Sequence, residues 1–102
     1  MVVVVANRIP VSKGHEAEFE RRWKDRKWSI AKLPGFLRTE VLRPVKGDFY
    51  VVMTHWRSMA DFERWTESEA FAEAHQNPPP KEAFSGPSAL EIHEVVVTME
   101  SG

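Results

Sequence analysis

Apolar residues recur at every second position in several segments of this chain, and this period predicts β-strands. The first such segment covers residues 2–11 and is rich in β-branched side chains. Its alternation places on one face Val3, Val5, Asn7, Ile9 and Val11. Further strands are predicted at residues 36–44, 49–57 and 89–99. Between the second and third, the turn residues 45–48 predict a hairpin.

After the first strand, the large apolar side chains are spaced by three, four and seven residues, which is typical of one buried stripe on a helix. Phe19, Trp23 and Ile30 follow this spacing. We therefore predict one continuous helix over residues 15–32, ended by the Pro-Gly pair that follows.

A second helical region follows the third predicted strand. Ser58 has an acidic residue three positions later, a pattern that predicts a helix start and a helix over residues 59–66. Ser68 predicts a second start, for a helix that contains His75. Residues 76–88 are rich in proline, glycine and polar side chains, so we predict a loop before the last strand.

The order of the predicted elements is strand, helix, strand, strand, helix pair, strand. This is the ferredoxin-like split βαβ order, so the sequence predicts an α+β fold with a four-stranded antiparallel sheet and helices on one face. The other face of the sheet carries apolar residues by alternation and would be exposed in a monomer. We therefore predict that a second copy of the chain covers this face in a homodimer.

Length and composition narrow the possible functions. The 102 residues fit a single domain over 1–102. The absence of cysteine excludes disulfides, thiolate catalysis and iron–sulfur clusters. A net charge of -1 argues against a nucleic-acid partner bound by phosphate attraction. The apolar N-terminal run is too short for a membrane span and has no basic segment before it, so we expect no membrane partner and a cytoplasmic protein.

Three residues are hard to place in a plain core. Asn7 lies on an otherwise apolar strand face, where an unpaired amide costs about 1–3 kcal/mol. It is either a hydrogen-bonded core residue, or part of a β-bulge, or a polar group aimed at a ligand. His75 lies near a helix end, where it suits the helix dipole, but histidine is also a common metal ligand. Trp65 lies on the short helix that leads toward His75, and core packing alone would explain it.

Two arginines form a further candidate group. Arg22 and Arg26 fall on or beside the buried stripe of the predicted helix, next to Trp23. Their aliphatic stems can cover apolar surface while their guanidinium groups reach water or a neighbouring carboxylate. The alternative is recognition of a ligand carboxylate, which the planar guanidinium matches well.

Six stretches of the sequence together resemble one known family. They are ANRIPV (6–11), FERRWKDR (19–26), PGF (34–36), VLRPVKGD (41–48), THW (54–56) and FERWTESEAFAEAH (62–75). They resemble the Isd-type haem-degrading monooxygenases, within the antibiotic-biosynthesis-monooxygenase (ABM) group of dimeric α+β barrels. The resemblance covers nearly the whole chain, and its most specific part is the last stretch.

The resemblance implies an enzyme that binds haem and opens the porphyrin ring. The family's Asn, Trp and His fall on Asn7, Trp65 and His75. By this resemblance His75 would be the proximal ligand of the haem iron. Asn7 would donate a hydrogen bond on the distal side, and Trp65 would press the porphyrin out of plane.

The resemblance also implies the remaining contacts and co-reactants. Arg22 and Arg26 would bind the haem propionates, and Trp23 would join them as a haem contact. Haem would be both cofactor and substrate, and O2 and an external electron donor, such as a reductase or ascorbate, would be consumed. The products would be free iron and an open-chain tetrapyrrole. Two dimerised chains would form the α+β barrel.

Two other functions are compatible with the same residues. A cofactor-free oxygenase of this fold would act on a quinol or phenolic substrate, with Asn7 and Trp65 in its cavity and His75 as a base or a bystander. A haem-binding or small-molecule-binding dimer would use the same pocket for storage or sensing, without ring opening.

Overall fold

The computed structural model describes residues 1–26, 29–76 and 78–102. Its four strands are β1 (Val3–Ile9), β2 (Phe36–Leu42), β3 (Tyr50–Trp56) and β4 (Ala89–Glu94). They form one sheet in the order β2-β3-β1-β4, and each neighbouring pair is antiparallel. The predicted ferredoxin-like arrangement is confirmed.

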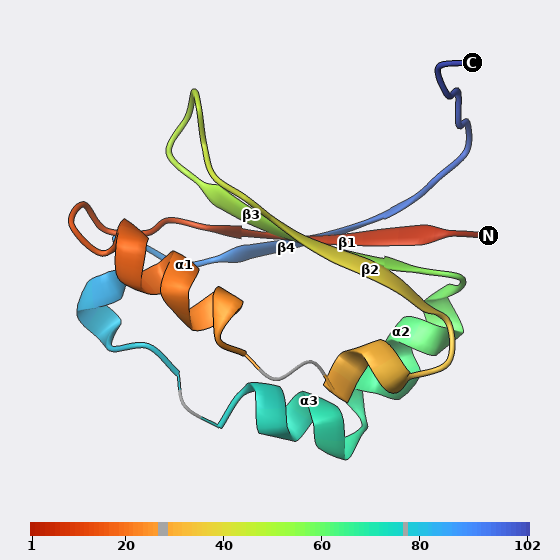
Figure 1. Cartoon of the computed structure of the whole chain (residues 1–102), viewed down its shortest axis with the longest axis horizontal. Helices are drawn as coiled ribbons and strands as arrows, with labels where there is room; N and C mark the ends of the chain where they lie inside the picture. The colour runs from red at the N-terminus through yellow and green to blue at the C-terminus, as the bar shows by residue number, and fades with distance from the viewer. Residues whose placement is uncertain (27–28, 77) are drawn as a thin grey trace.

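The helical elements lie on one face of this sheet (Figure 1). They are α1 (Glu16–Lys24), α2 (Met59–Thr66), α3 (Glu69–Ala74) and the 3-10 turns η1 (Ser29–Lys32) and η2 (Lys81–Ala83). The serine side chains predicted to start α2 and α3 do so, since Ser58 accepts from the Asp61 N–H and Ser68 from the Phe71 N–H.

The prediction of one helix over residues 15–32 is wrong. Helix α1 ends at Lys24, and a separate 3-10 turn, η1, begins at Ser29; residues 27 and 28 lie outside the described chain. Tertiary packing explains the break, because Phe19 and Ile30 belong to two different core clusters. A straight helix would hold these two side chains about 16 Å apart along one axis, whereas the chain turns to reach both clusters.

The last strand is shorter than predicted. It ends at Glu94 rather than at residue 99, and the chain then leaves the sheet, with Val96 80 % and Met99 90 % exposed. The partner strand sets this limit, because Glu94 pairs with Val3, the first residue of β1. One further hydrogen bond joins the Val95 N–H to the carbonyl of Val2, the residue before β1. The first strand likewise ends at Ile9, since the proline that follows has no N–H to donate.

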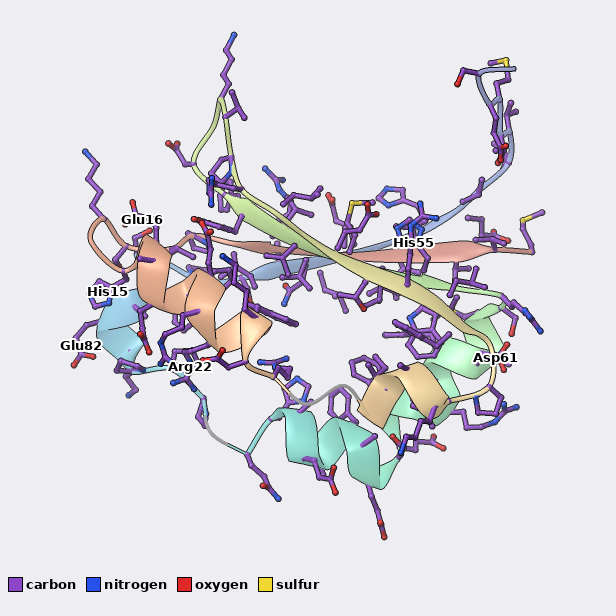
Figure 2. The ribbon with its side chains drawn as sticks, viewed as in Figure 1. His15, Glu16, Arg22, His55, Asp61 and Glu82 are labelled. Carbon is purple, nitrogen blue, oxygen red and sulfur yellow. The ribbon has the colours of Figure 1, made fainter. Side chains whose placement is uncertain are left out.

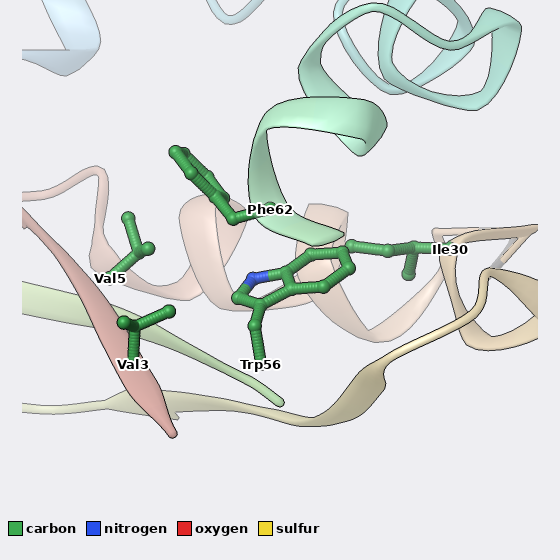
Figure 3. Close-up of a cluster of buried hydrophobic side chains, with 5 residues drawn as sticks. All are labelled: Val3, Val5, Ile30, Trp56 and Phe62. Carbon is green, nitrogen blue, oxygen red and sulfur yellow. The ribbon is translucent and has the colours of Figure 1, made fainter. Parts of the chain in front are cut away.

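Two apolar clusters lie between the sheet and the helices. The first contains Val3, Val5, Ile30, Trp56 and Phe62 (Figure 3). The second contains Ile9, Phe19, Tyr50 and Val52. Trp56 is fully buried, and its indole N–H donates to Thr54 Oγ1 at 3.0 Å. Both clusters contribute to the walls of one cavity, which is described below.

The opposite face of the sheet has no helix over it in the described parts of the chain (Figure 1). By alternation and register it combines apolar residues such as Val4 and Met53 with charged or titratable ones. His55 lies on this face, is only 9 % exposed, and approaches Glu40 with Nε2 3.1 Å from Oε1 (Figure 2). The prediction that a second copy covers this face stays a prediction.

Candidate functional site

A cavity of about 400 Å³ lies between the sheet and the helical layer. Strands, helices and the loop after α3 all contribute to its lining, which is mainly aliphatic and aromatic. The polar side chains among the lining residues include Asn7, Arg26 and His75. A largely apolar cavity with a few polar groups is the usual form of a small-molecule site.

His75 is held at the C-terminal end of α3, where its ring lines the cavity. Its Nδ1 lies 2.7 Å from the carbonyl oxygen of Phe71, and its ring centroid lies 4.2 Å from that of Phe71. A carbonyl oxygen can only accept, so Nδ1 carries the proton in the neutral ring and Nε2 keeps its lone pair. This is the tautomer that a histidine needs to bind a metal through Nε2, and the carbonyl fixes the ring orientation.

Trp65 reaches the cavity from α2 and forms the wall beside His75. Its ring stacks on Trp56, with centroids 5.6 Å apart and planes inclined by 29°. It also meets Phe71 edge-on at 4.9 Å and lies 6.5 Å from the His75 ring. These contacts hold the indole as a rigid, flat surface. Its Nε1 is buried and has no hydrogen-bond partner within the described chain.

Asn7 lies on the floor of the cavity, in the middle of β1 between β3 and β4. Its side chain is half-buried and makes no hydrogen bond to any residue that the structure describes. The interpretation of Asn7 as a hydrogen-bonded core residue is therefore not supported. The structure brings Asn7, Trp65 and His75 to one cavity, Asn7 from the sheet and the other two from the helices.

The α1 side of the cavity carries a cation. The Arg26 guanidinium carbon lies 3.9 Å from the centre of the Trp23 ring, and both side chains line the cavity. Burial lowers the pKa of Arg26, and the positive charge of Arg22 lowers it further. Arg26 has no carboxylate partner in the described residues. Arg22 itself does not line the cavity, so the structure separates the two predicted arginines.

Sequence reasoning missed several cavity residues. Thr39 and Thr54 lie opposite each other on β2 and β3 and face the cavity. The Thr39 hydroxyl is buried without a partner in the described chain. Alternation along the two strands could have placed both threonines on the helix-covered face. The predicted loop contributes Pro79 and Phe84 to the lining and so forms part of the wall.

The fold agrees with comparisons to known proteins. Residues 1–77 match the family described as "Antibiotic biosynthesis monooxygenase", and the chain belongs to this family. It is 39 % identical over 97 residues to the "Heme oxygenase (mycobilin-producing)" of Mycobacterium tuberculosis, covering 94 % of this chain and 91 % of the relative.

Solved structures share the fold of this chain. The haem degrader MhuD from Mycobacterium tuberculosis, with two haems bound in its active site, superimposes with a TM-score of 0.80 at 37 % identity, covering 96 % of this chain and 99 % of MhuD. A variant of SnoaB, a cofactor-independent oxygenase from Streptomyces nogalater, superimposes with a TM-score of 0.75 at 27 % identity, covering 98 % of each chain.

Proposed function

We propose that this protein is a haem-degrading monooxygenase. The observation that carries the proposal is the His75 imidazole, whose Nε2 lone pair is left available in a cavity lined by apolar rings. The relationship to a haem oxygenase over 94 % of the chain supports the same substrate. The cavity fits haem chemically, since it offers a nitrogen donor for the iron, flat aromatic walls and one half-buried cation.

His75 is the proposed iron ligand. The Phe71 carbonyl accepts from Nδ1–H and makes the imidazole a better donor at Nε2. The short helix α3 holds this arrangement, because Phe71 and His75 are four residues apart and lie on the same side of it.

Asn7 and Trp65 act on the porphyrin from two directions. Asn7 has an amide with no partner in the described chain, so it can donate to a ligand without breaking an existing hydrogen bond. Trp65 cannot turn away from a bound ring, because Trp56 supports its face and Phe71 its edge. A rigid indole of this kind would press against a porphyrin bound in the cavity.

Arg26 is the proposed contact for a haem propionate. Its half-buried guanidinium gains from any carboxylate that approaches, because burial has removed much of its water. Trp23 holds the guanidinium in place through its ring face. Arg22, outside the cavity lining, would help through its charge alone.

Haem is the substrate of this reaction as well as the group that binds oxygen. The reaction consumes O2 and electrons, and an external donor, either a reductase or ascorbate, would supply these electrons. The residues of this protein would bind the haem, orient it, and offer it the amide of Asn7. The products are iron and an open-chain tetrapyrrole.

The uncovered sheet face is the proposed dimer surface. It carries Val4 and Met53 among charged side chains, and a second copy would remove these apolar residues from water.

No helix in the described parts of the chain is long and apolar enough to cross a membrane. We propose that the homodimer works in the cytoplasm.

A hemin titration tests the binding step. Wild type should develop a Soret band that saturates, and His75→Ala should lose it or bind at least tenfold more weakly. His15→Ala is the matched control, because His15 precedes α1 at one end of the molecule and does not line the cavity (Figure 2). Equal Soret bands in wild type and His75→Ala would contradict the proposal.

A cofactor-free oxygenase is the second candidate, and the likeness to SnoaB favours it. The same apolar cavity would then hold a phenolic substrate, with Asn7 binding an oxygen atom and His75 acting as a base. Oxygen uptake with a phenol, by protein that shows no hemin binding, would establish this function and exclude the first.

A further inference from the structure

One carboxylate connects helix α1 to the sheet. Glu20 Oε2 accepts a hydrogen bond from Arg43 Nε at 2.7 Å and another from the Tyr50 hydroxyl, and its Oε1 accepts from the second guanidinium nitrogen of Arg43. Arg43 directly follows β2 and Tyr50 begins β3. The Glu20 side chain is 18 % exposed, compared with 50 % for Glu18 on the same helix.

Helix α1 also packs on the sheet through an apolar side chain. Within α1, all of whose residues are described, Phe19 alone is buried. The residue before the helix, His15, makes no capping hydrogen bond with its side chain. The Phe19 ring packs on Tyr50 with centroids 4.9 Å apart. Tyr50, which is 3 % exposed, therefore takes part both in the apolar contact with Phe19 and in the hydrogen bond to Glu20.

The cavity wall depends on the position of this helix. Trp23 follows Glu20 by three residues, so the two lie on neighbouring parts of one helix face. Trp23 and Thr39 line the main cavity and also a second, more open depression of about 370 Å³. Glu20, Arg43 and Tyr50 line that depression and not the main cavity. The Trp23 side chain thus stands between the ligand cavity and the ionic contact.

We infer that Glu20, Tyr50 and Arg43 form a clamp that positions Trp23 and Arg26 at the cavity wall and so sets the affinity for the bound ligand. For haem as that ligand, the inference rests on the proposed function. The three residues do not line the main cavity, so they are positioning residues. Arg43 and Tyr50 hold the pKa of Glu20 at about 2, and the clamp stays ionised at neutral pH.

Glu20→Gln breaks the clamp with little change in size. The amide still accepts from Tyr50 but loses the charge that pairs with Arg43. Glu18→Gln is the matched control, because Glu18 pairs with Arg21 inside the helix and reaches no strand. At a temperature where circular dichroism shows all proteins folded, Glu20→Gln should bind hemin about tenfold more weakly. Glu18→Gln should match wild type.

A double-mutant cycle separates positioning from a general loss of stability. Arg43→Gln and the double variant Glu20→Gln/Arg43→Gln should weaken hemin binding by about the same factor as Glu20→Gln alone, because either change opens the clamp. A purely structural role would lower the melting temperature and leave the hemin dissociation constant of the folded protein unchanged, which would contradict the inference.

Amide hydrogen exchange of the ligand-free protein tests the clamp without haem. Glu20→Gln should accelerate exchange in Glu16–Lys24 and leave α3 as in wild type. Wild type that binds no hemin would overturn the proposed function, and faster exchange in α1 would then still support the clamp. Unchanged exchange, or an unchanged hemin dissociation constant in a wild type that binds hemin, would overturn the clamp.

Discussion

The two helical walls of the cavity are held by contacts of different range. The wall that carries Trp65 and His75 is held locally, by Ser58 and Ser68 at the starts of α2 and α3 and by rings close along the chain. The wall that carries Trp23 and Arg26 is held by Glu20, whose partners Arg43 and Tyr50 lie 23 and 30 positions away.

This difference separates the part of the site that is proposed to bind iron, at His75, from the part that is proposed to set the position of Trp23 and Arg26 against the ligand. Short-range contacts form as soon as a helix forms, so they fix the His75 tautomer with little help from the rest of the fold. Long-range contacts depend on the finished sheet. A change at Arg43 or Tyr50 therefore acts on the α1 wall and leaves the contact between His75 and Phe71 in place.

The largest effect on the free energy of unfolding should come from Trp56, because Trp65 of the His75 wall stacks on its ring. Trp56→Ala removes the surface on which Trp65 stacks, together with contacts to Phe36 and Phe62. We expect a loss of about 3–5 kcal/mol in the free energy of unfolding, measured by urea titration. Trp56→Phe should cost clearly less, and equal losses for the two variants would contradict the role of the stack.

The next largest effect on the free energy of unfolding should come from Gly35, which lies beside the start of α2. Gly35 has a φ of +82°, and a Cβ there would lie 2.2 Å from the Asp61 side chain at the start of α2. We expect Gly35→Ala to cost about 1–3 kcal/mol in unfolding free energy. Gly47 also has a positive φ, of +117°, but has open space around it. Gly47→Ala should therefore cost less, and a larger cost at Gly47 would sink this explanation.

A smaller and more local effect should come from Ser68. Its hydroxyl oxygen accepts from the Phe71 N–H, and its proton is donated to the Trp65 carbonyl at 2.6 Å. Ser68→Ala should cost about 1 kcal/mol in unfolding free energy and should weaken hemin binding, because α3 carries His75. Ser58→Ala, which uncaps α2, is the comparison. We expect a similar loss of stability with a smaller loss of hemin affinity, and the reverse order would count against the local account.

The smallest effect at neutral pH, and a distinctive one in acid, should come from the ionisation of Glu20. Its pKa is lowered from 4.5 to about 2 in the folded chain, first by the hydrogen bond from Arg43 and then by that from Tyr50. A lowered folded-state pKa stabilises the fold in full above pH 4.5, and this stabilisation is lost as the pH falls from 4.5 towards 2. Urea unfolding across that range should show a shallower decline for Glu20→Gln than for wild type. Parallel curves would mean that the carboxylate does not stabilise the α1 wall.

The locally determined features were the ones that sequence could predict. Strand alternation placed Asn7 on the same face as Val3 and Val5, and the structure buries these two valines under the helices. The two serines marked the starts of the helices that carry Trp65 and His75. The structure brings these three residues to one cavity, although their roles in catalysis stay predictions.

The features that the sequence did not predict depend on residues that lie far away along the chain. The helix over residues 15–32 breaks because Phe19 and Ile30 pack into different clusters. Strand β4 stops at Glu94 because Val3 begins its partner. Spacing alone could not tell Arg26, which lines the cavity, from Arg22, which does not. No pattern in the sequence around Glu20 indicates the hydrogen bonds that it accepts from Arg43 and Tyr50.

A turnover measurement on the hemin complex tests the central claim most directly. The wild-type complex is given ascorbate and catalase in air, and absorbance spectra and product masses are followed. The account predicts that the Soret band decays while an open-chain tetrapyrrole and free iron appear, and that His75→Ala does neither. A wild-type Soret band that persists unchanged, with intact haem recovered at the end, would contradict it and leave a haem-binding protein.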